Sequence, residues 1–282
     1  CAKKFSGSVA AHSYEDIIEN FEHTIITVPN ALHYPISIEL MNHQKNLLIE
    51  KPIGITANES KEINLLTKKN NLSIVCGNMR RQLRIASFVK KIIMQKTLGE
   101  IISFKCREGG IFNWPIQSEN FMDKKNSGGG VLLDTGSHTI EQILFYFGFP
   151  NKIKYYDNSI DNIESDCYLE LEFEKFQGSL QLSRTLGLDS KMYIKFSNGD
   201  IIFDLVGNKL DIECSSELKK LIGLENFNQK NQSYDELIAQ QINEWYKYIE
   251  GNKSANVVTT EDAHNVMKFI DYCYNNKLDM EF

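Results

Sequence analysis

Strand and helix patterns alternate over residues 24–76, and this alternation limits the folds open to the chain. The β-branched run Thr24–Val28 and the apolar run Asn46–Ile49 are typical of buried strands, and polar residues with a proline follow each. Helical patterns lie at about 35–42 and 58–69, and a further strand pattern spans Leu72–Cys76. Strand–helix–strand alternation predicts a parallel sheet covered by helices.

Polar side chains gather where these predicted strands end. Ligands of such sheets bind at the carboxyl ends of the strands, so this edge is a predicted binding edge. Lys51 is either a surface lysine or a charge directed at a substrate oxygen. Residues at the edge are Pro29, Asn30, Glu50, Lys51 and the polar cluster Gly77–Arg81.

A glycine run, Gly128–Gly130, leads into a helix predicted at about 132–147. Glycine lets the backbone turn sharply and approach a ligand. Asp134 and His138 are four residues apart and therefore lie on one helix face. A carboxylate beside an imidazole can hold its tautomer and tune it as a proton acceptor. The alternative is a helix start with an acidic first turn and a surface histidine.

The remainder of the chain is rich in strand patterns. A helix at about 85–95 and a strand at 100–107 precede the glycine run. Short intervals between the later runs predict an open, mostly antiparallel sheet with helices on one face, and Asn198-Gly199 predicts a hairpin. The runs are Lys152–Asp157, Cys167–Phe173, Gly178–Arg184, Lys191–Phe196, Ile201–Leu205 and Lys209–Glu213. Helices at about 234–250 and 260–275 follow, the second with Thr259 or Thr260 as its cap.

Composition narrows the class of protein. The chain has 282 residues and a net charge of −6 with both signs interspersed, so it carries no footprint for nucleic acid. No apolar run reaches the length of a membrane span. Its six cysteines lie far apart without a C-x-x-C pair, which favours free thiols in a reducing cytoplasm over a zinc site or a disulfide scaffold. No set of histidines, cysteines and carboxylates predicts a metal site.

With these residues in view, the chain resembles the Gfo/Idh/MocA family of NAD(P)-dependent sugar and polyol oxidoreductases. The resemblance implies an α/β fold: an incomplete Rossmann domain, a doubly wound parallel sheet, over residues 1–81, and then an α+β substrate-binding and dimerisation domain with an open, mostly antiparallel sheet over 82–282. The matching segments are Thr27–His33, Glu50-Lys51-Pro52, Gly77–Arg81, Leu98–Ile101 and Gly128–His138.

The resemblance also implies roles for particular residues. Lys51, Asp134 and His138 would be catalytic, and these three with Trp114 would contact substrate. Thr27, Pro29, Asn30, His33, Glu50, Lys51 and Arg80 would contact the cofactor, NAD or NADP. Two departures stand out: Glu141 replaces the aspartate usual three residues after the histidine, and Asn78-Met79 replace an aromatic and an amide before the arginine.

One element of the family pattern is absent from the sequence. Such a domain begins with a strand, a G-x-G-x-x-G turn and a helix, and no G-x-G-x-x-G occurs among the 282 residues. We expect a unit of roughly 30 residues or more upstream of Cys1, by truncation rather than as a natural short form. The 282 residues alone should then bind a dinucleotide poorly.

The resemblance implies hydride transfer between a nicotinamide cofactor and a hydroxyl or keto group of a sugar, nucleotide sugar or cyclitol. It also implies a homodimer or homotetramer formed through the C-terminal sheet. The cysteine spacing, the charge distribution and the short apolar runs favour a cytoplasmic location and no nucleic-acid or membrane partner. The alternative is a non-catalytic sugar-binding or regulatory protein of the same fold that has lost cofactor binding.

Overall fold

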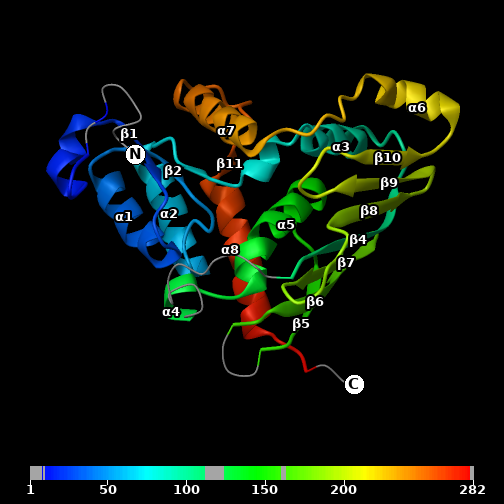
Figure 1. Cartoon of the computed structure of the whole chain (residues 1–282), viewed down its shortest axis with the longest axis horizontal. Helices are drawn as coiled ribbons and strands as arrows, with labels where there is room; N and C mark the ends of the chain where they lie inside the picture. The colour runs from blue at the N-terminus through cyan, green and yellow to red at the C-terminus, as the bar shows by residue number, and fades with distance from the viewer. Residues whose placement is uncertain (1–7, 9, 112–123, 160–162, 280–282) are drawn as a thin grey trace.

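A computed structural model describes residues 8, 10–111, 124–159 and 163–279, and Figure 1 shows how their helices and strands are arranged. The first sheet has the order β1-β2-β3-β11, in which β1, β2 and β3 are parallel and β11 is antiparallel to β3. Its strands are β1 (His23–Ile26), β2 (Asn46–Ile49), β3 (Val75–Cys76) and β11 (Val258–Thr259). The predicted Rossmann-type parallel sheet is therefore confirmed, with an antiparallel strand added.

Helices α1 (Asn30–Asn42) and α2 (Ala57–Asn70) connect the parallel strands. The α1 helix begins five residues before its predicted start at Pro35, which instead lies inside the helix. A proline is typical of a first helical turn, and the sequence pattern therefore placed the start too late. The α2 helix begins where the Thr56 side chain accepts a hydrogen bond of 3.2 Å from the Glu59 backbone N–H.

The second sheet has seven strands in the order β10-β9-β8-β4-β7-β6-β5, and only the β4–β7 pairing is parallel. This confirms the predicted open, mostly antiparallel sheet. The predicted hairpin joins β8 and β9, although Ser197 and Asn198 form the turn and Gly199 already belongs to β9. The strands are β4 (Ile101–Gly109), β5 (Lys152–Asp157), β6 (Asp166–Glu172), β7 (Gln177–Ser183), β8 (Lys191–Phe196), β9 (Gly199–Asp204) and β10 (Leu210–Glu213).

The described part of the chain contains six further helices and three 3₁₀ turns. The α8 helix begins with a capping box between Thr259 and Asp262, which confirms the predicted cap. The helices are α3 (Arg84–Gln95), α4 (Lys124–Ser127), α5 (Val131–Phe147), α6 (Ser216–Ile222), α7 (Tyr234–Ile249) and α8 (Thr260–Asn275); the 3₁₀ turns are η2 (Glu15–Asn20), η3 (Met79–Gln82) and η5 (Leu224–Asn226). Among the described residues, no helix has the length and apolar character that a membrane span requires.

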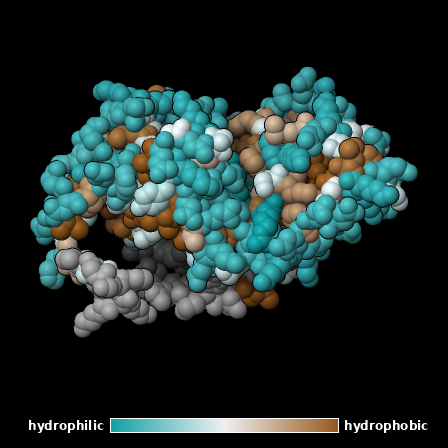
Figure 2. All heavy atoms as spheres, turned by 90° about the horizontal axis from the view of Figure 1, so that it is seen from above, coloured by the Kyte–Doolittle hydropathy of each residue, from teal (hydrophilic) through white to brown (hydrophobic). Residues whose placement is uncertain are grey.

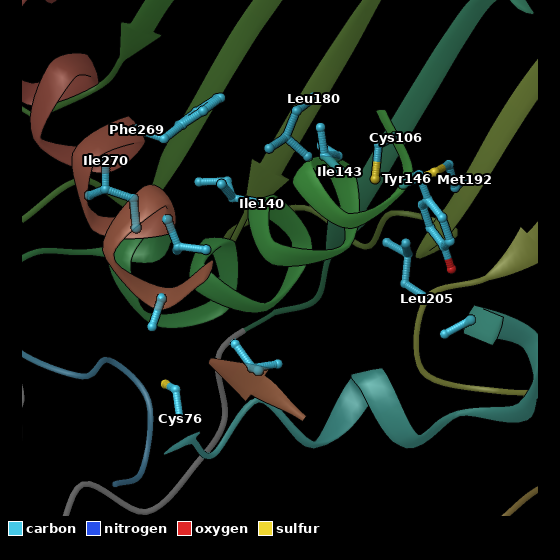
Figure 3. Close-up of a cluster of buried hydrophobic side chains, with 14 of the residues drawn as sticks. Cys76, Cys106, Ile140, Ile143, Tyr146, Leu180, Met192, Leu205, Phe269 and Ile270 are labelled. Atoms are coloured by element: carbon cyan, nitrogen blue, oxygen red, sulfur yellow. The ribbon is translucent and has the colours of Figure 1, made fainter. Parts of the chain in front are cut away.

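Helix α5 lies between the second sheet and α8 (Figures 1 and 3). Ile140 and Ile143 of α5 are fully buried, and Leu180 of β7 belongs to the same cluster. On the other side of α5, Phe269 and Ile270 of α8 complete this core (Figure 3). A helix buried on two sides leaves little freedom for the residues in its first two turns, where Asp134 and His138 lie.

The opposite face of the second sheet is polar. Along β6 the side chains alternate between buried and accessible, and cross-strand ion pairs such as Lys154–Glu170, at 2.8 Å, lie on the accessible side. Elsewhere, in the view of Figure 2, hydrophilic residues cover most of the molecular surface and hydrophobic residues form separate patches. The predicted contact between copies through this sheet remains a prediction.

Candidate active site

Lys51 and Asp134, which are far apart in the sequence, meet between the two sheets. Lys51 follows β2 in the first sheet, and Asp134 lies in the first turn of α5. The Lys51 Nζ donates to Asp134 Oδ1 at 2.8 Å and to the Asp134 carbonyl oxygen at 3.0 Å. The peptide bond between Lys51 and Pro52 is cis. The sequence-predicted strand end and the predicted helix therefore form one site.

Asp134 has a second cationic partner that the sequence did not single out. Arg184, directly after β7, donates from its Nη2 to Asp134 Oδ2 at 2.8 Å. Burial alone would raise the pKa of Asp134, but the charges of Lys51 and Arg184 outweigh it and hold this pKa below its usual range. The Asp134 carboxylate is therefore ionised between two cations.

His138 lies one helical turn after Asp134 but is not hydrogen-bonded to it. Both carboxylate oxygens of Asp134 contact cations, and His138 Nδ1 is buried with no hydrogen-bond partner among the described residues. Asp134 thus does not fix the tautomer of the ring, in contrast to the expectation from their spacing. Burial, together with the charges of Lys51 and Arg80, lowers the pKa of His138 well below its usual range. The ring is therefore neutral at physiological pH.

A small pocket is lined by Lys51, Asn78 and Ser137, with residues of α8 on its other side. The Ser137 hydroxyl donates to the Asp134 carbonyl oxygen at 2.9 Å. Asn78, one of the two departures from the family pattern, is buried here, and its Oδ1 has no hydrogen-bond partner in the described part of the chain. Asn78 therefore lies at the site, as a residue of the loop after β3.

Some residues of the predicted cofactor edge are exposed, and others are buried and hydrogen-bonded within the protein. Thr27 and Pro29 are exposed, and Asn30 donates from Nδ2 to the Ser127 carbonyl oxygen at 3.0 Å. His33 is only 1% exposed, and its Nδ1 and Nε2 lie 2.6 Å and 2.8 Å from the carbonyl oxygens of Pro52 and Val28. Both ring nitrogens of His33 are therefore already engaged within the protein. Contact between His33 and a cofactor remains a prediction.

Arg80 is also engaged internally. Its guanidinium forms a two-pronged pair with Glu108 of β4, at 2.9 Å and 2.6 Å, and both side chains are buried. Arg81 donates from both Nε and Nη2 to a single oxygen of Glu141, Oε1, and its guanidinium lies 3.9 Å from the centre of the Phe145 ring. Two adjacent arginines of η3 thus hold the end of the first sheet onto β4 and α5. Whether Arg80 touches a cofactor remains a prediction.

Glu50 closes this edge of the sheet. It accepts a hydrogen bond of 3.1 Å from the Lys51 backbone N–H, and burial raises its pKa. A Cβ atom on Gly77 would lie 3.0 Å from the Glu50 Cα, so the loop after β3 packs directly on Glu50. Trp114, the remaining predicted site residue, lies outside the described residues.

The glycine run is explained by internal packing. Cβ atoms on Gly129 and Gly130 would overlap the Tyr274 hydroxyl and the Glu164 carbonyl oxygen. The Glu164 carboxylate accepts hydrogen bonds from the backbone N–H groups of Gly130 and Leu132 and from the Tyr274 hydroxyl, at 2.9–3.1 Å. This buried carboxylate caps α5 and fixes the turn that carries Asp134. The sequence pattern offered no signal for Glu164, which lies between two predicted strands.

The geometry defines a class of protein: a Rossmann-type sheet joined to an open antiparallel sheet, with a lysine, an aspartate and a neutral histidine at the junction. Two family profiles match the chain. Residues 1–77 match the oxidoreductase family with an NAD-binding Rossmann fold, and residues 87–202 match the Gfo/Idh/MocA C-terminal domain. The chain belongs to the Gfo/Idh/MocA family of oxidoreductases.

Individual relatives agree with the profiles. An uncharacterised oxidoreductase of Schizosaccharomyces pombe is 30% identical over 196 residues, which is 65% of this chain and 52% of the relative. The NADP⁺-dependent scyllo-inositol 2-dehydrogenase of Bacillus subtilis is 26% identical, over 54% of this chain and 42% of the relative. The matches thus span about half the length of these curated relatives or less.

Solved structures share the fold. A levoglucosan dehydrogenase in complex with NADH and levoglucosan superimposes with a TM-score of 0.81 at 20% identity, over 98% of this chain and 83% of that one. The described arrangement of two sheets around α5 and α8 is therefore the arrangement of this family of folds.

Proposed function

We propose that the protein is an NAD- or NADP-dependent dehydrogenase that acts on a hydroxyl or keto group of a sugar, nucleotide sugar or cyclitol. The observation that carries this proposal is the ionised cluster of Lys51, Asp134 and Arg184 beside a neutral His138. An ammonium and a neutral imidazole suit the oxidation of an alcohol, because one stabilises the alkoxide and the other accepts the proton. Relatives named for scyllo-inositol and levoglucosan support a hydroxyl-rich substrate.

The strand-end edge fits a nicotinamide dinucleotide. The Oδ1 of Asn78 is buried without a partner among the described residues, and Pro29, the residue before α1, provides no side-chain cap for the helix. Backbone N–H groups at such a helix start favour an anionic group. Thr27, Pro29 and Asn30 on one side and Glu50 and Lys51 on the other would hold the cofactor. When bound, the dinucleotide supplies the hydride transfer, and the protein orients the reactants.

The chain's own residues handle the proton and the charge. In the oxidative direction the substrate hydroxyl gives its proton to His138, whose lowered pKa keeps the ring ready to accept it. Lys51 donates to the substrate oxygen and stabilises the negative charge that develops there. Asp134 holds the ammonium in place through Oδ1. In the reverse direction the imidazolium returns the proton to the oxygen.

Steady-state assays with NAD⁺ or NADP⁺ and a panel of sugars, cyclitols and sugar nucleotides test this function through the absorbance of the reduced cofactor. In the parent protein that carries the expected upstream segment, we expect turnover, and a loss of about 10²–10⁴-fold in kcat in His138→Ala, the usual contribution of positioned proton transfer. The dissociation constant for the dinucleotide should stay the same in this variant. Sugar binding without any turnover in that parent protein would favour the non-catalytic alternative.

The same proposal includes three further points. The chain divides into two domains at residue 81, the protein forms a homodimer or homotetramer through the second sheet, and it is located in the cytoplasm. Charge pairs such as Lys152–Glu172, at 3.4 Å, lie on the accessible face of that sheet and support a polar contact there rather than an apolar one. Sedimentation of the purified protein measures its oligomeric state directly.

A further inference from the structure

Arg184 reaches the candidate site from the second sheet. Its side chain is only 11% exposed, and its Nη2 contacts Asp134 Oδ2, the carboxylate oxygen that Lys51 does not hold. Asp134 thus receives one cation from the end of β2 and another from the end of β7. The two contacts fix the carboxylate between two parts of the fold.

The backbone around Arg184 is itself held in place. The Arg184 N–H donates to the Ser165 carbonyl oxygen at 2.8 Å. On either side of it, the hydroxyl groups of Ser183 and Thr185 donate to Asp166 Oδ1 of the neighbouring strand β6. The guanidinium therefore extends from an ordered strand end, and its position relative to Asp134 is set by the sheet.

The contact between Arg184 and Asp134 affects how many N–H donors of Lys51 remain available. An ammonium has three N–H donors, and Asp134 takes two of them, one at Oδ1 and one at the backbone carbonyl. The third donor has no partner among the described residues. If Asp134 Oδ2 had no partner, the carboxylate could rotate and accept the third Lys51 N–H as well. A carboxylate has about four acceptor positions, and an ammonium has three donors.

We propose that Arg184 is a positioning residue that holds Asp134 Oδ2 and so keeps one Lys51 donor available for the substrate oxygen. This role rests on the proposed function, in which Lys51 stabilises that oxygen. Arg184 acts through Asp134 and requires no contact of its own with the substrate. The sequence signal for it is a single arginine at the end of a predicted strand, which is too common to be diagnostic.

Kinetics of Arg184→Gln give the first test. Misplacing a reacting group can cost up to about 100-fold, so we expect kcat to fall by about 10- to 100-fold with a smaller change in KM. Arg184→Lys should recover part of this loss, because the contact with Asp134 involves a single N–H rather than a fork. Arg107→Gln is the matched control, since Arg107 of β4 in the same sheet pairs with Asp189 of the loop before β8, at 3.5 Å, and should retain normal kinetics.

The second test needs no turnover. The rate at which an acylating reagent modifies Lys51, followed by mass spectrometry of its peptide, reports how firmly the ammonium is held. We expect severalfold slower modification in Arg184→Gln, an intermediate rate in Arg184→Lys and an unchanged rate in Arg107→Gln. An unchanged Lys51 rate in Arg184→Gln overturns the positioning role. Absence of turnover in the parent protein that carries the upstream segment overturns the proposed function instead, so the two failures are distinguishable.

Discussion

At the scale of single residues, Lys51 donates two hydrogen bonds from Nζ to Asp134, while its side chain remains 19% exposed. Lys51→Met keeps the packing of the stem and removes only the charge. Loss of one electrostatic donor typically costs about 2.7–4 kcal/mol in the transition state, so kcat/KM should fall by about 10²–10³-fold. Steady-state kinetics and a melting curve on the variant measure both effects.

Lys51→Arg serves as the companion variant. It keeps the charge, but a planar guanidinium does not fit the compact position of an ammonium, so we expect no rescue of kcat/KM. Were Lys51 only a structural partner of Asp134, Lys51→Met would leave kcat/KM intact and lower the melting temperature slightly. That result would end the catalytic interpretation of Lys51.

The sequence predicted Lys51, Asp134 and His138 as members of one site, and the structure brings Lys51 and Asp134 into contact. The resemblance of the segments Glu50-Lys51-Pro52 and Gly128–His138 to the family carried this prediction, because spacing alone favoured a surface histidine. The sequence did not predict Arg184 or Glu164, because each reaches the site through a tertiary contact with no local pattern. For the same reason it did not predict that His33 and Arg80 are engaged by buried internal partners.

At the scale of elements, the turn before α5 depends on close backbone packing. Gly130→Ala would place a Cβ against the Glu164 carbonyl oxygen, which cannot move without disturbing the cap of the helix. Overpacking of this kind costs about 1–3 kcal/mol, so we expect the free energy of unfolding to fall by that amount. Chemical denaturation of the purified variant measures it.

Gly187→Ala is the matched control for this prediction. Gly187 lies in the exposed loop after β7, and a Cβ there would meet no atom within 4 Å in the described structure. Its stability should match that of the unchanged protein within about 0.5 kcal/mol. Equal stabilities for both variants would contradict the packing account of the glycine run.

Most helices and strands could be predicted because their signals are local: apolar periodicity, caps such as Thr259, and the hairpin around Asn198. Pairings between strands that are far apart in the sequence could not be predicted. The short strand β11 has only two residues, and its pairing with β3 depends on the tertiary fold rather than on any periodicity. The parallel pairing of β4 with β7 also joins strands that are not neighbours in sequence.

At the scale of the whole molecule, α8 links the two sheets. Asp271 accepts a hydrogen bond of 2.7 Å from the Ala57 N–H at the start of α2, while Phe269 of the same helix is fully buried in the core. Phe269→Ala should therefore lower the free energy of unfolding by about 3–5 kcal/mol in a single transition. Circular dichroism and intrinsic fluorescence should report the same midpoint.

Tyr272→Ala provides the comparison, because Tyr272 lies on the same helix and is 43% exposed. We expect a change of about 0.5 kcal/mol or less in this variant. Two separate unfolding transitions in Phe269→Ala would mean that the sheets unfold independently and that α8 does not couple them.

The return of the chain to its first sheet has a consequence during synthesis on the ribosome. Strand β3 ends at Cys76, and its antiparallel partner β11 begins only at Val258, about 180 residues later. At about 5–20 residues per second, that interval lasts roughly 9–36 s. Throughout it, one edge of β3 lacks its final neighbour, and an open strand edge is a site for pairing with other chains. We therefore expect the nascent protein to be exposed to misassembly at this edge until β11 and α8 have been synthesised.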